Sequence, residues 1–470
     1  MNDVYVIGVD TLRFGKYPEK SIKDLAAETV TGCLQDAGLE KKDIQALWFS
    51  NSGWGDSGQS MIRGQVALRR SGIQEIPITN VENACAGGAT AFHHAWMAVA
   101  GGLHEVTMAV GAEKLYRDNA KAVFAGFLGA IDFEACLEIV KGLEGVQFRL
   151  SEEDEVQIRR FREKYGAARS GKGKQPSRKR GFTSRIKEAR DALVVAIMLG
   201  EKMGYGPMRE LVSYSKGDHS PFMDVYGFAA RQHMKTFGST VEQMAHIASK
   251  NHFNSSLNPN AQYRFQVPLD QVLADRLVSW PLTRSMCAPI GDGAASALLC
   301  SEAVVNRRGL RRQAVKVRAS VLGSGRERSI GFEEPEIGER LSRLAYERAG
   351  VSPRDIRVAE VHDATAYGEL RQVENLGFCP PGEGGVLAQS EATGLGGNIP
   401  VNPSGGLISR GHPIGASGLA QIHELVTQLR GRAGKRQVND PTLALAENGG
   451  GALGAEEAAM GIHILEGPPR

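Results

Sequence analysis

One cysteine stands where a thiol could act as a nucleophile. Cys85 lies between an apolar run over 76–81, which predicts a strand, and an alanine-rich run over 86–100, which predicts a helix. Its neighbours are small, so another backbone or a thin substrate arm could approach the sulfur closely. Because amide dipoles at a helix start stabilise anions, we expect a lowered pKa for this thiol. Taken alone, the pattern also fits a buried cysteine on a tightly packed helix.

A histidine far downstream could activate this thiol. His412 precedes Pro413 at the end of a glycine-rich stretch, and residues 416–429 predict a second helix of small residues. The backbone of a residue before proline is held extended, which fixes the direction of the imidazole. Taken alone, His412 could be a histidine that closes a turn. Paired with Cys85, it is a candidate general base for a nucleophile.

Two further segments have the same character. His362 follows a strand-like run and opens a predicted helix, and the adjacent Asp363 could orient a histidine or cap that helix, of which we expect the cap. Three glycines at 449–451 follow Asn448 and predict a turn. Backbone N–H groups in such a turn can form an oxyanion hole, although a plain hairpin turn would show the same glycines.

These four segments, in this order, resemble the active-site loops of the thiolase superfamily, above all the sterol-carrier-protein-2 type and its bacterial acetyl-CoA acetyltransferase relatives. The segments 110–114, 237–261 and 281–295 resemble regions that support those loops, so the resemblance spans nearly the whole chain. It implies that Cys85 takes the acyl group as a thioester and that His412 activates it. It further implies a first oxyanion hole from His412 and His362, and a second from the N–H groups of Cys85 and Gly450.

One departure from the resemblance bears on the reaction. Thiolases need a second acid and base, usually a cysteine, and the two positions that carry it in relatives hold Ala364 and Asn448 here. We therefore expect a coenzyme A-dependent acyltransferase that cleaves a bulky or aromatic 3-oxoacyl-CoA, rather than one that condenses two acetyl-CoA molecules. The lesser candidates are Asn448 near the chemistry and, for substrate binding, Tyr367, Ser404, Gly405 and Pro413.

Two other function classes remain open at this stage. One is a carbon–carbon lyase with a thiolase fold, which releases its product by retro-aldol chemistry. The other is a non-catalytic homologue that binds acyl-CoA or lipid, which the two missing thiols favour. The retained Cys85 counts against the lyase, since such relatives tend to lack the nucleophile.

The composition agrees with an enzyme that buries a large core. The 470 residues are 42% hydrophobic and 23% charged, with a formal charge of +3, which indicates two or three domains and no nucleic-acid partner. Six cysteines lack metal-ligand spacing, so we expect a reducing compartment and no metal site. Without a signal-like N-terminus or an apolar run of about 20 residues, we expect a cytoplasmic protein with no membrane contact.

Strands and helices alternate in two similar series, which predicts an α/β fold with layered sheets. The resemblance implies the thiolase fold, in which two five-stranded halves form an α-β-α-β-α core. We expect a first half over 1–115, an inserted loop domain over 116–226, completion of the first half over 227–305 and a second half over 306–470.

The expected partners follow from the same reasoning. Coenzyme A is the expected co-substrate, with no permanently bound cofactor. The segment 159–190 is rich in lysine and arginine, which predicts a solvated loop or, alternatively, attraction of the phosphates of coenzyme A. A third alternative is docking to an acidic partner or RNA, and the lack of aromatic residues over 171–180 counts against RNA. The resemblance also implies a homodimer or a dimer of dimers, and an accessory protein with an OB-fold and a zinc ribbon is a further expectation.

Overall fold

The computed structural model describes residues 2–53, 59–116, 127–130, 152–165, 219–326, 328, 331–453 and 456–469. Most of the basic segment 159–190 and most of the predicted loop domain over 116–226 lie outside these ranges. The structural statements below concern the described residues.

The first half of the chain builds five strands with helices on both faces. Its first helix shows how the local sequence sets the bounds: Ser21 caps the N-terminus with a capping box, and Gly38 ends it in the left-handed conformation at φ 66°. The elements are β1 (Val4–Thr11), α1 (Ile22–Ala37), β2 (Ala46–Ser50), α2 (Arg63–Ala67), β3 (Ile78–Val81), α3 (Gly87–Ala100), β4 (Val106–Glu113), β7 (Gly293–Ser301) and α12 (Glu302–Arg308).

The second half repeats this series with one strand reduced to a bridge. Its elements are β8 (Val315–Ser324), α13 (Ile337–Ala349), β9 (Val358–Glu360), α14 (Ala366–Asn375), α15 (Gly384–Gln389), a π-helical turn (Gly406–Arg410), α16 (Ile414–Leu429), β10 (Leu443–Gly450) and β11 (Ala459–Glu466). Val401 pairs in parallel with Ala359 of β9, as β3 pairs in parallel with β2. The two halves are therefore equivalent, strand by strand.

The halves join edge to edge through their first strands. The sheet order is β3-β2-β4-β7-β1-β8-β11-β10-β9, so β1 and β8 are neighbours at its centre. Only two residue pairs connect them, Tyr5 with Lys316 and Val6 with Val315. Because the junction is this short, it joins the two sheets without merging them, and each half has its own outer helix, α1 or α13.

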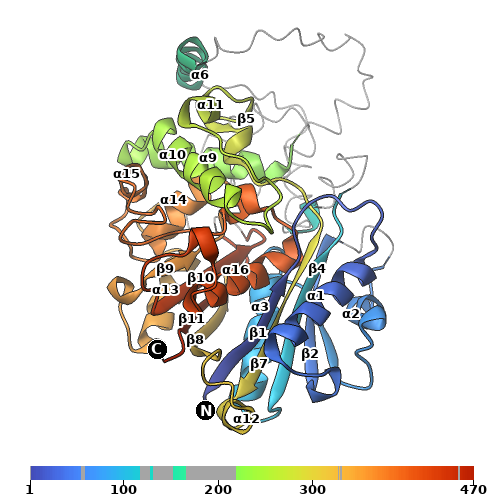
Figure 1. The fold of residues 1–470 in the computed structure, drawn as a ribbon. Helices are drawn as coiled ribbons and strands as arrows, with labels where there is room; N and C mark the ends of the chain where they lie inside the picture. Colours follow the sequence, from blue (N-terminus) through green and yellow to red (C-terminus); the bar gives the residue numbers. More distant parts are fainter. Residues whose placement is uncertain are drawn as a thin grey trace.

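Helices α3 and α16 form the central layer of the molecule (Figure 1). Each contacts strands of both halves, while α1 covers the outer face of the first half and α13 that of the second. This arrangement confirms the predicted α-β-α-β-α layering. A Cβ added to Gly88 would lie 2.9 Å from the Gly418 nitrogen, so the two helices touch where only glycine fits.

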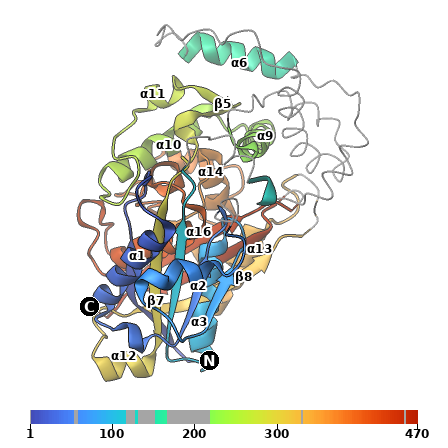
Figure 2. The same cartoon turned by 90° about the vertical axis from the view of Figure 1, so that its right-hand side faces the viewer.

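A third group of elements lies over one end of the layers (Figures 1 and 2). It contains α6 (Glu152–Tyr165), α9 (Pro221–Phe237), α10 (Val241–Ser256), α11 (Leu269–Leu273), β5 (Leu277–Ser279) and β6 (Leu282–Thr283). These elements share a hydrophobic cluster with α14, which ties them to the second half. The predicted domain boundaries remain predictions, and α9 runs across the one expected between 226 and 227.

Most predicted elements are present with shifted ends, and one differs in kind. Gly449 and Gly450 belong to β10, so only Gly451, at φ 68°, takes the turn conformation expected of all three glycines. Strand pairing continues through both residues because they face Ala459 and Met460 of β11. Among the described helices, none combines the length and the apolar character that a membrane span requires.

Candidate active site

Cys85 lies on a tight turn immediately before α3. The Ala86 N–H donates to the Asn83 carbonyl at 2.9 Å, and the Gly87 N–H donates to the Ala84 carbonyl at 3.2 Å. Ala84 takes a φ of 46°, a left-handed conformation that costs a non-glycine residue energy. The helix starts at Gly87, so the thiol precedes the first turn in which the sequence placed it.

Gly450 lets the end of β10 approach this turn. A Cβ at Gly450 would lie 2.3 Å from the Ala86 nitrogen and 2.6 Å from the Cys85 nitrogen. No side chain can occupy that space without displacing the backbone that carries the nucleophile. The backbone of the second half thus packs directly against the turn that carries the nucleophile, which is possible only because residue 450 is glycine.

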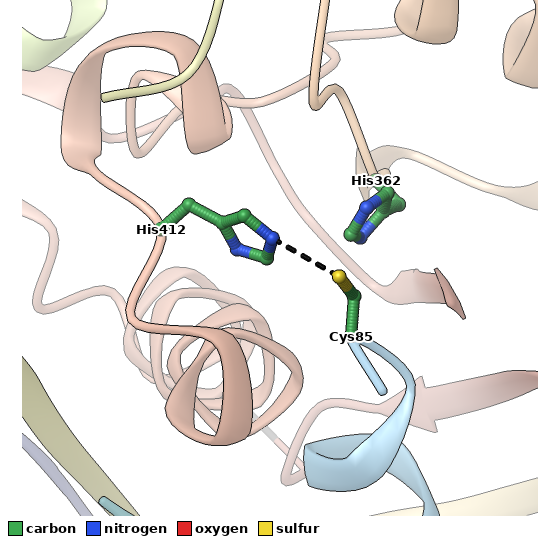
Figure 3. Close-up of side chains that lie close together, drawn as sticks. All are labelled: Cys85, His362 and His412. Atoms are coloured by element: carbon green, nitrogen blue, oxygen red, sulfur yellow. Dashed lines mark hydrogen bonds between the residues drawn. The ribbon is translucent and has the colours of Figure 1, made fainter. Parts of the chain in front are cut away.

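His412 faces Cys85 from the loop before α16 (Figure 3). Its Nε2 lies 3.3 Å from the Cys85 sulfur. On the other side of the ring, Nδ1 lies 2.7 Å from the Ser417 hydroxyl oxygen, and that hydroxyl donates to the Pro413 carbonyl at 3.0 Å. Since the hydroxyl proton is used there, Nδ1–H donates to Ser417 and Nε2 keeps a free lone pair toward the thiol. This is the tautomer that a general base requires.

His362 completes the group with the opposite tautomer. Its ring lies edge-on to His412, with centroids 5.2 Å apart. The Asn448 amide Nδ2 donates to His362 Nδ1 at 3.1 Å, so the ring proton is on Nε2. The backbone N–H of His362 donates to the buried Glu447 carboxyl at 2.8 Å. One histidine therefore accepts a proton in this site while the other donates a hydrogen bond.

Burial sets the charge state of these groups. It raises the pKa of the Cys85 thiol to about 12, with a further increase from the Glu113 carboxylate. Burial also lowers the pKa of His412 well below its usual value, and His362 lowers it further. For His362, burial lowers the pKa to about 3. At neutral pH the site is a neutral thiol beside two neutral imidazoles.

This corrects the expected thiolate. A helix N-terminus stabilises an anion by about 0.3–2 kcal/mol, whereas burying a charge shifts a pKa by up to about 3–5 units, or roughly 4–7 kcal/mol. Desolvation is the larger effect, and no cation offsets it among the groups that shift the Cys85 pKa. Proton transfer to His412 must therefore accompany attack by the sulfur rather than precede it.

Two backbone amides face the sulfur. The N–H groups of Cys85 and Gly451 both interact with it and lower its pKa slightly against the effect of burial. The sequence assigned the second amide to Gly450, one residue earlier. The role of the Gly450 N–H remains a prediction, while its missing Cβ has the steric role described above.

Asp363 organises the loop that leads to His412. Its carboxylate accepts from the Leu407 N–H at 2.6 Å and from the Asn251 side chain at 2.8 Å. The residue that caps α14 is Thr365, whose hydroxyl accepts from the Gly368 N–H at 3.2 Å. The expected cap by Asp363 is therefore wrong. The carboxylate two residues before the cap instead fixes the π-helical turn through Leu407.

The lesser candidates have structural contacts of their own. Ser404 donates its hydroxyl to Glu360 at 2.7 Å, and Pro413 accepts from Ser417 as described. A Cβ at Gly405 would lie 2.4 Å from that of Ser255, so Gly405 packs closely against α10. Tyr367 is buried in the hydrophobic cluster below α9. Substrate contacts by these four residues remain predictions.

An apolar wall adjoins the nucleophile. Leu115 and Ile414 form a small cluster against which Cys85 packs, together with Phe127 and Ile290. Sequence inspection missed all four residues, because nothing in their local pattern distinguishes them from ordinary core. It also missed Ser417, although a hydroxyl one turn into the helix after His412 was a readable signal.

The same three side chains could in principle hold a metal. The ligand atoms of Cys85, His362 and His412 lie within 4.8 Å of one another, the one such group found in the described ranges. However, His362 presents Nε2–H rather than a lone pair toward the sulfur, and the thiol is protonated. The residues as they stand therefore fit proton transfer better than metal ligation.

Comparison with known proteins identifies the family. The chain matches the family model described as thiolase N-terminal domain over residues 4–126, and that described as thiolase C-terminal domain-like over 337–462. It is 32% identical over 471 residues to an acetyl-CoA acetyltransferase of Methanothermobacter thermautotrophicus, covering 99% of this chain and all of the relative. The chain belongs to the thiolase family.

Other thiolase relatives point in several functional directions. The chain is 33% identical over 490 residues to human sterol carrier protein 2, covering 99% of this chain and 75% of that protein. It is 28% identical over 457 residues to a benzoylsuccinyl-CoA thiolase subunit of Thauera aromatica, covering 96% of both. A solved structure titled Ltp2-ChsH2(DUF35) aldolase matches the fold with a TM-score of 0.69 at 20% identity, covering 100% of this chain and 98% of that one.

Proposed function

We propose that this thiolase family member is a coenzyme A-dependent acyltransferase that cleaves a 3-oxoacyl-CoA through a thioester on Cys85. The observation that carries the proposal is the 3.3 Å contact between His412 Nε2 and the Cys85 sulfur, with the histidine tautomer fixed by Ser417. It supplies both a nucleophile and the base that this nucleophile needs.

The side chains define the steps. The Cys85 sulfur attacks the 3-oxo carbon while its proton passes to His412 Nε2. The oxyanion at the acylated cysteine lies within reach of the N–H groups of Cys85 and Gly451, and the thioester oxygen of the leaving group accepts from His362 Nε2–H. A single donor of this kind contributes roughly 3–4 kcal/mol to lowering a barrier.

The substrate class follows from the wall beside the nucleophile. Leu115, Ile414, Phe127 and Ile290 present apolar surface next to Cys85, which suits a bulky or aromatic acyl group. The relative that acts on benzoylsuccinyl-CoA is consistent with such a substrate. Coenzyme A serves as co-substrate, and the proposed reaction uses no permanently bound cofactor.

A carbon–carbon lyase is the second candidate, since the aldolase structure shares the fold. Its title also names a second component, and we extend to this chain the proposal of an accessory OB-fold, zinc-ribbon protein. A homodimer or dimer of dimers and a cytoplasmic location are proposed on family grounds alone. A lyase would release its product without coenzyme A and without a covalent intermediate.

Mass spectrometry of the intact protein separates these functions. Incubation with 3-oxoacyl-CoA thioesters of increasing acyl size, in the absence of free coenzyme A, is expected to leave an acyl group on Cys85. Added coenzyme A should release it, and Cys85→Ala should abolish the adduct. Turnover that needs no coenzyme A and leaves Cys85 unmodified would contradict the thiolase and support the lyase.

A further inference from the structure

The proposed cleavage leaves one proton unassigned. When the C2–C3 bond breaks, its electron pair remains on the leaving thioester, whose C2 must be protonated. The incoming coenzyme A must then lose its thiol proton. Ala364 carries no acidic or basic group, and the neutral amide of Asn448 donates to His362 Nδ1.

The described cysteines do not fill this gap. Cys287 lies beside the Ala364 segment, where its backbone pairs with Thr365, but its S–H donates to the Thr283 carbonyl at 3.4 Å. Cys379 packs with the hydrophobic cluster on the far side of the second half, among residues of α13 and β11. Within the described ranges, the acid and base must therefore come from a different residue type.

Glu447 is also excluded by its position. Its side chain is fully buried beneath the His362 backbone, and one carboxyl oxygen accepts from the His362 N–H at 2.8 Å. Glu447 follows Ala446 and precedes Asn448 along β10, so it points to the face opposite the Asn448 side chain that reaches His362. It can support the loop but cannot reach a substrate carbon on the Cys85 side.

Tyr226 lies beside the segment that carries His362. It lies on α9, which packs against α14 (Figure 1). The Cβ position of Gly368 is 3.7 Å from Tyr226 Cε1 and 3.2 Å from the His362 carbonyl oxygen. The ring therefore lies beside Gly368 at the start of α14, close to the backbone that carries His362.

The Tyr226 hydroxyl is unpaired and electrostatically linked to the nucleophile. Within the part of the chain that the structure describes, no hydrogen bond engages it. Burial is the main cause that raises the pKa of Tyr226 well above its usual value, and interactions with Glu457, Cys85 and Glu447 raise it as well. Two buried tyrosines differ from the half-buried Tyr226: the Tyr346 hydroxyl donates to the Leu376 carbonyl at 2.8 Å, and the charges acting on Tyr367 come from Arg371 and glutamates rather than from Cys85.

We propose that the Tyr226 hydroxyl is the second acid and base of this site, an inference that rests on the thiolytic function proposed above. In cleavage, the Tyr226 O–H gives its proton to C2 of the leaving enolate, which departs as a neutral acyl-CoA. The resulting phenolate takes the thiol proton of coenzyme A. The coenzyme A thiolate attacks the acyl group on Cys85, and the departing cysteine sulfur recovers its proton from His412.

A phenol suits both transfers. The α-carbon of a thioester enolate is a far stronger base than any phenolate, so protonation of C2 is downhill. A thiol has an ordinary pKa of about 8.5 and a phenol one of about 10, so the phenolate also removes the coenzyme A proton favourably. A positioned group of this kind contributes about 10²–10⁴-fold to rate.

Tyr226→Phe removes the hydroxyl and leaves the ring. The direct readout is exchange of the C2 protons of acetyl-CoA and of succinyl-CoA in D₂O, followed by mass spectrometry. When the acetyl or succinyl group passes to Cys85, the departing coenzyme A takes the Tyr226 proton, and the resulting phenolate can remove a C2 proton from a second thioester. We therefore expect the wild type to exchange at least one of the two thioesters and Tyr226→Phe to lose that exchange by about 100-fold or more. Acylation of Cys85 by p-nitrophenyl acetate should stay within threefold of wild type, because the p-nitrophenolate leaves without a proton.

Tyr5→Phe is the control for this test, and the role of Tyr226 and the proposed function fail on different results. Tyr5→Phe removes a hydroxyl on β1, whose contact is Arg311 at 3.4 Å, and should leave exchange unchanged. Undiminished exchange in Tyr226→Phe, or no exchange by the wild type with either thioester, would overturn the role of Tyr226. Failure of the wild type to acylate Cys85 with any substrate would instead overturn the proposed function itself.

Discussion

The nucleophile and its base occupy equivalent places in the two halves, yet they are held by different means. Cys85 stands between β3 and α3, and His412 stands between the Val401 bridge and α16. Backbone hydrogen bonds hold the first turn, together with hydrogen bonds from the Ser52 hydroxyl to the Ala84 carbonyl and from the Ala84 N–H to the Glu82 carboxylate. Side-chain hydrogen bonds from Asp363 and Ser417 hold the second.

The difference teaches which changes each half can tolerate. The Cys85 turn lies against the Gly450 backbone with no room for a Cβ between them, so it is sensitive to crowding from outside. A loop held by side-chain hydrogen bonds is sensitive to the loss of a single polar atom. The two halves of the fold supply two similar positions. The position in the first half holds a nucleophile whose placement depends on close packing, and the position in the second half holds a base whose placement depends on hydrogen bonds.

Crowding the nucleophile should have the largest effect. In Gly450→Ala the new methyl group would meet the Ala86 nitrogen at 2.3 Å, so the Cys85 turn must move. Because misplacing a reacting group by about 1 Å can cost 10²-fold, we expect acylation of Cys85 by p-nitrophenyl acetate to fall by at least about 100-fold. The rate of p-nitrophenolate release at saturating ester measures it.

Gly396→Ala is the matched control for this substitution. A Cβ there meets no atom within 4 Å, and the residue is not among the glycines with positive φ. Its acylation rate should match that of wild type. Equal rates for wild type and Gly450→Ala would show that the turn is not sterically defined.

Loss of the hydrogen bond that positions His412 should slow acylation less than crowding of the nucleophile does. Ser417→Ala removes the acceptor that holds His412 Nδ1–H at 2.7 Å. We expect acylation to slow by about 10- to 100-fold, part of the roughly 10²–10⁴ that a positioned base contributes. Folding should be retained, as a matching thermal unfolding midpoint would show.

Ser256→Ala serves as the control because that exposed hydroxyl bonds only the Phe253 carbonyl of its own helix. It is expected to keep the wild-type acylation rate. If Ser417→Ala acylates as fast as Ser256→Ala, the tautomer of His412 does not depend on Ser417, and the base is placed by the backbone like the nucleophile.

The smallest expected effect is the pH dependence of Cys85 alkylation, which tests whether the nucleophile is a thiol or a thiolate. A thiol reacts with iodoacetamide as the thiolate, whose fraction rises about tenfold per pH unit below the pKa. Burial raises the pKa of Cys85 to about 12. The alkylation rate of Cys85 should therefore climb from about pH 6 to 9 without a plateau. A rate that levels off within that range would restore the ionised cysteine expected from sequence.

Much of the fold could be predicted because its elements carry local signals. The capping box at Ser21 and the glycine at 38 mark the bounds of α1, and the helix expected over 416–429 ends at the same residue as α16. Local sequence signals gave the wrong structure where pairing with a distant strand decides the conformation. Gly449 and Gly450 have the composition of a turn, but β11 lies beside them and extends β10.

The site was predictable only in part, for the same reason. Cys85 and His412 stand in recognisable motifs, and the structure brings them together. Tyr226, Leu115 and Phe127 have no such motif, since a residue becomes part of a site through neighbours that are distant in sequence. Asp363 could be recognised as important, yet its partner at Leu407 lay beyond any local rule.

The sequence by itself determined the two layered halves, the small residues where α3 and α16 meet, and the chemical identity of the nucleophile and its base. These follow from periodicity, residue size and side-chain chemistry, which are local properties. Only the tertiary structure decided the charge on Cys85, the tautomers of His412 and His362, and the tyrosine placed beside the His362 segment. Charge and proton position depend on burial and on hydrogen-bond partners from distant segments, and those exist only after the chain has folded.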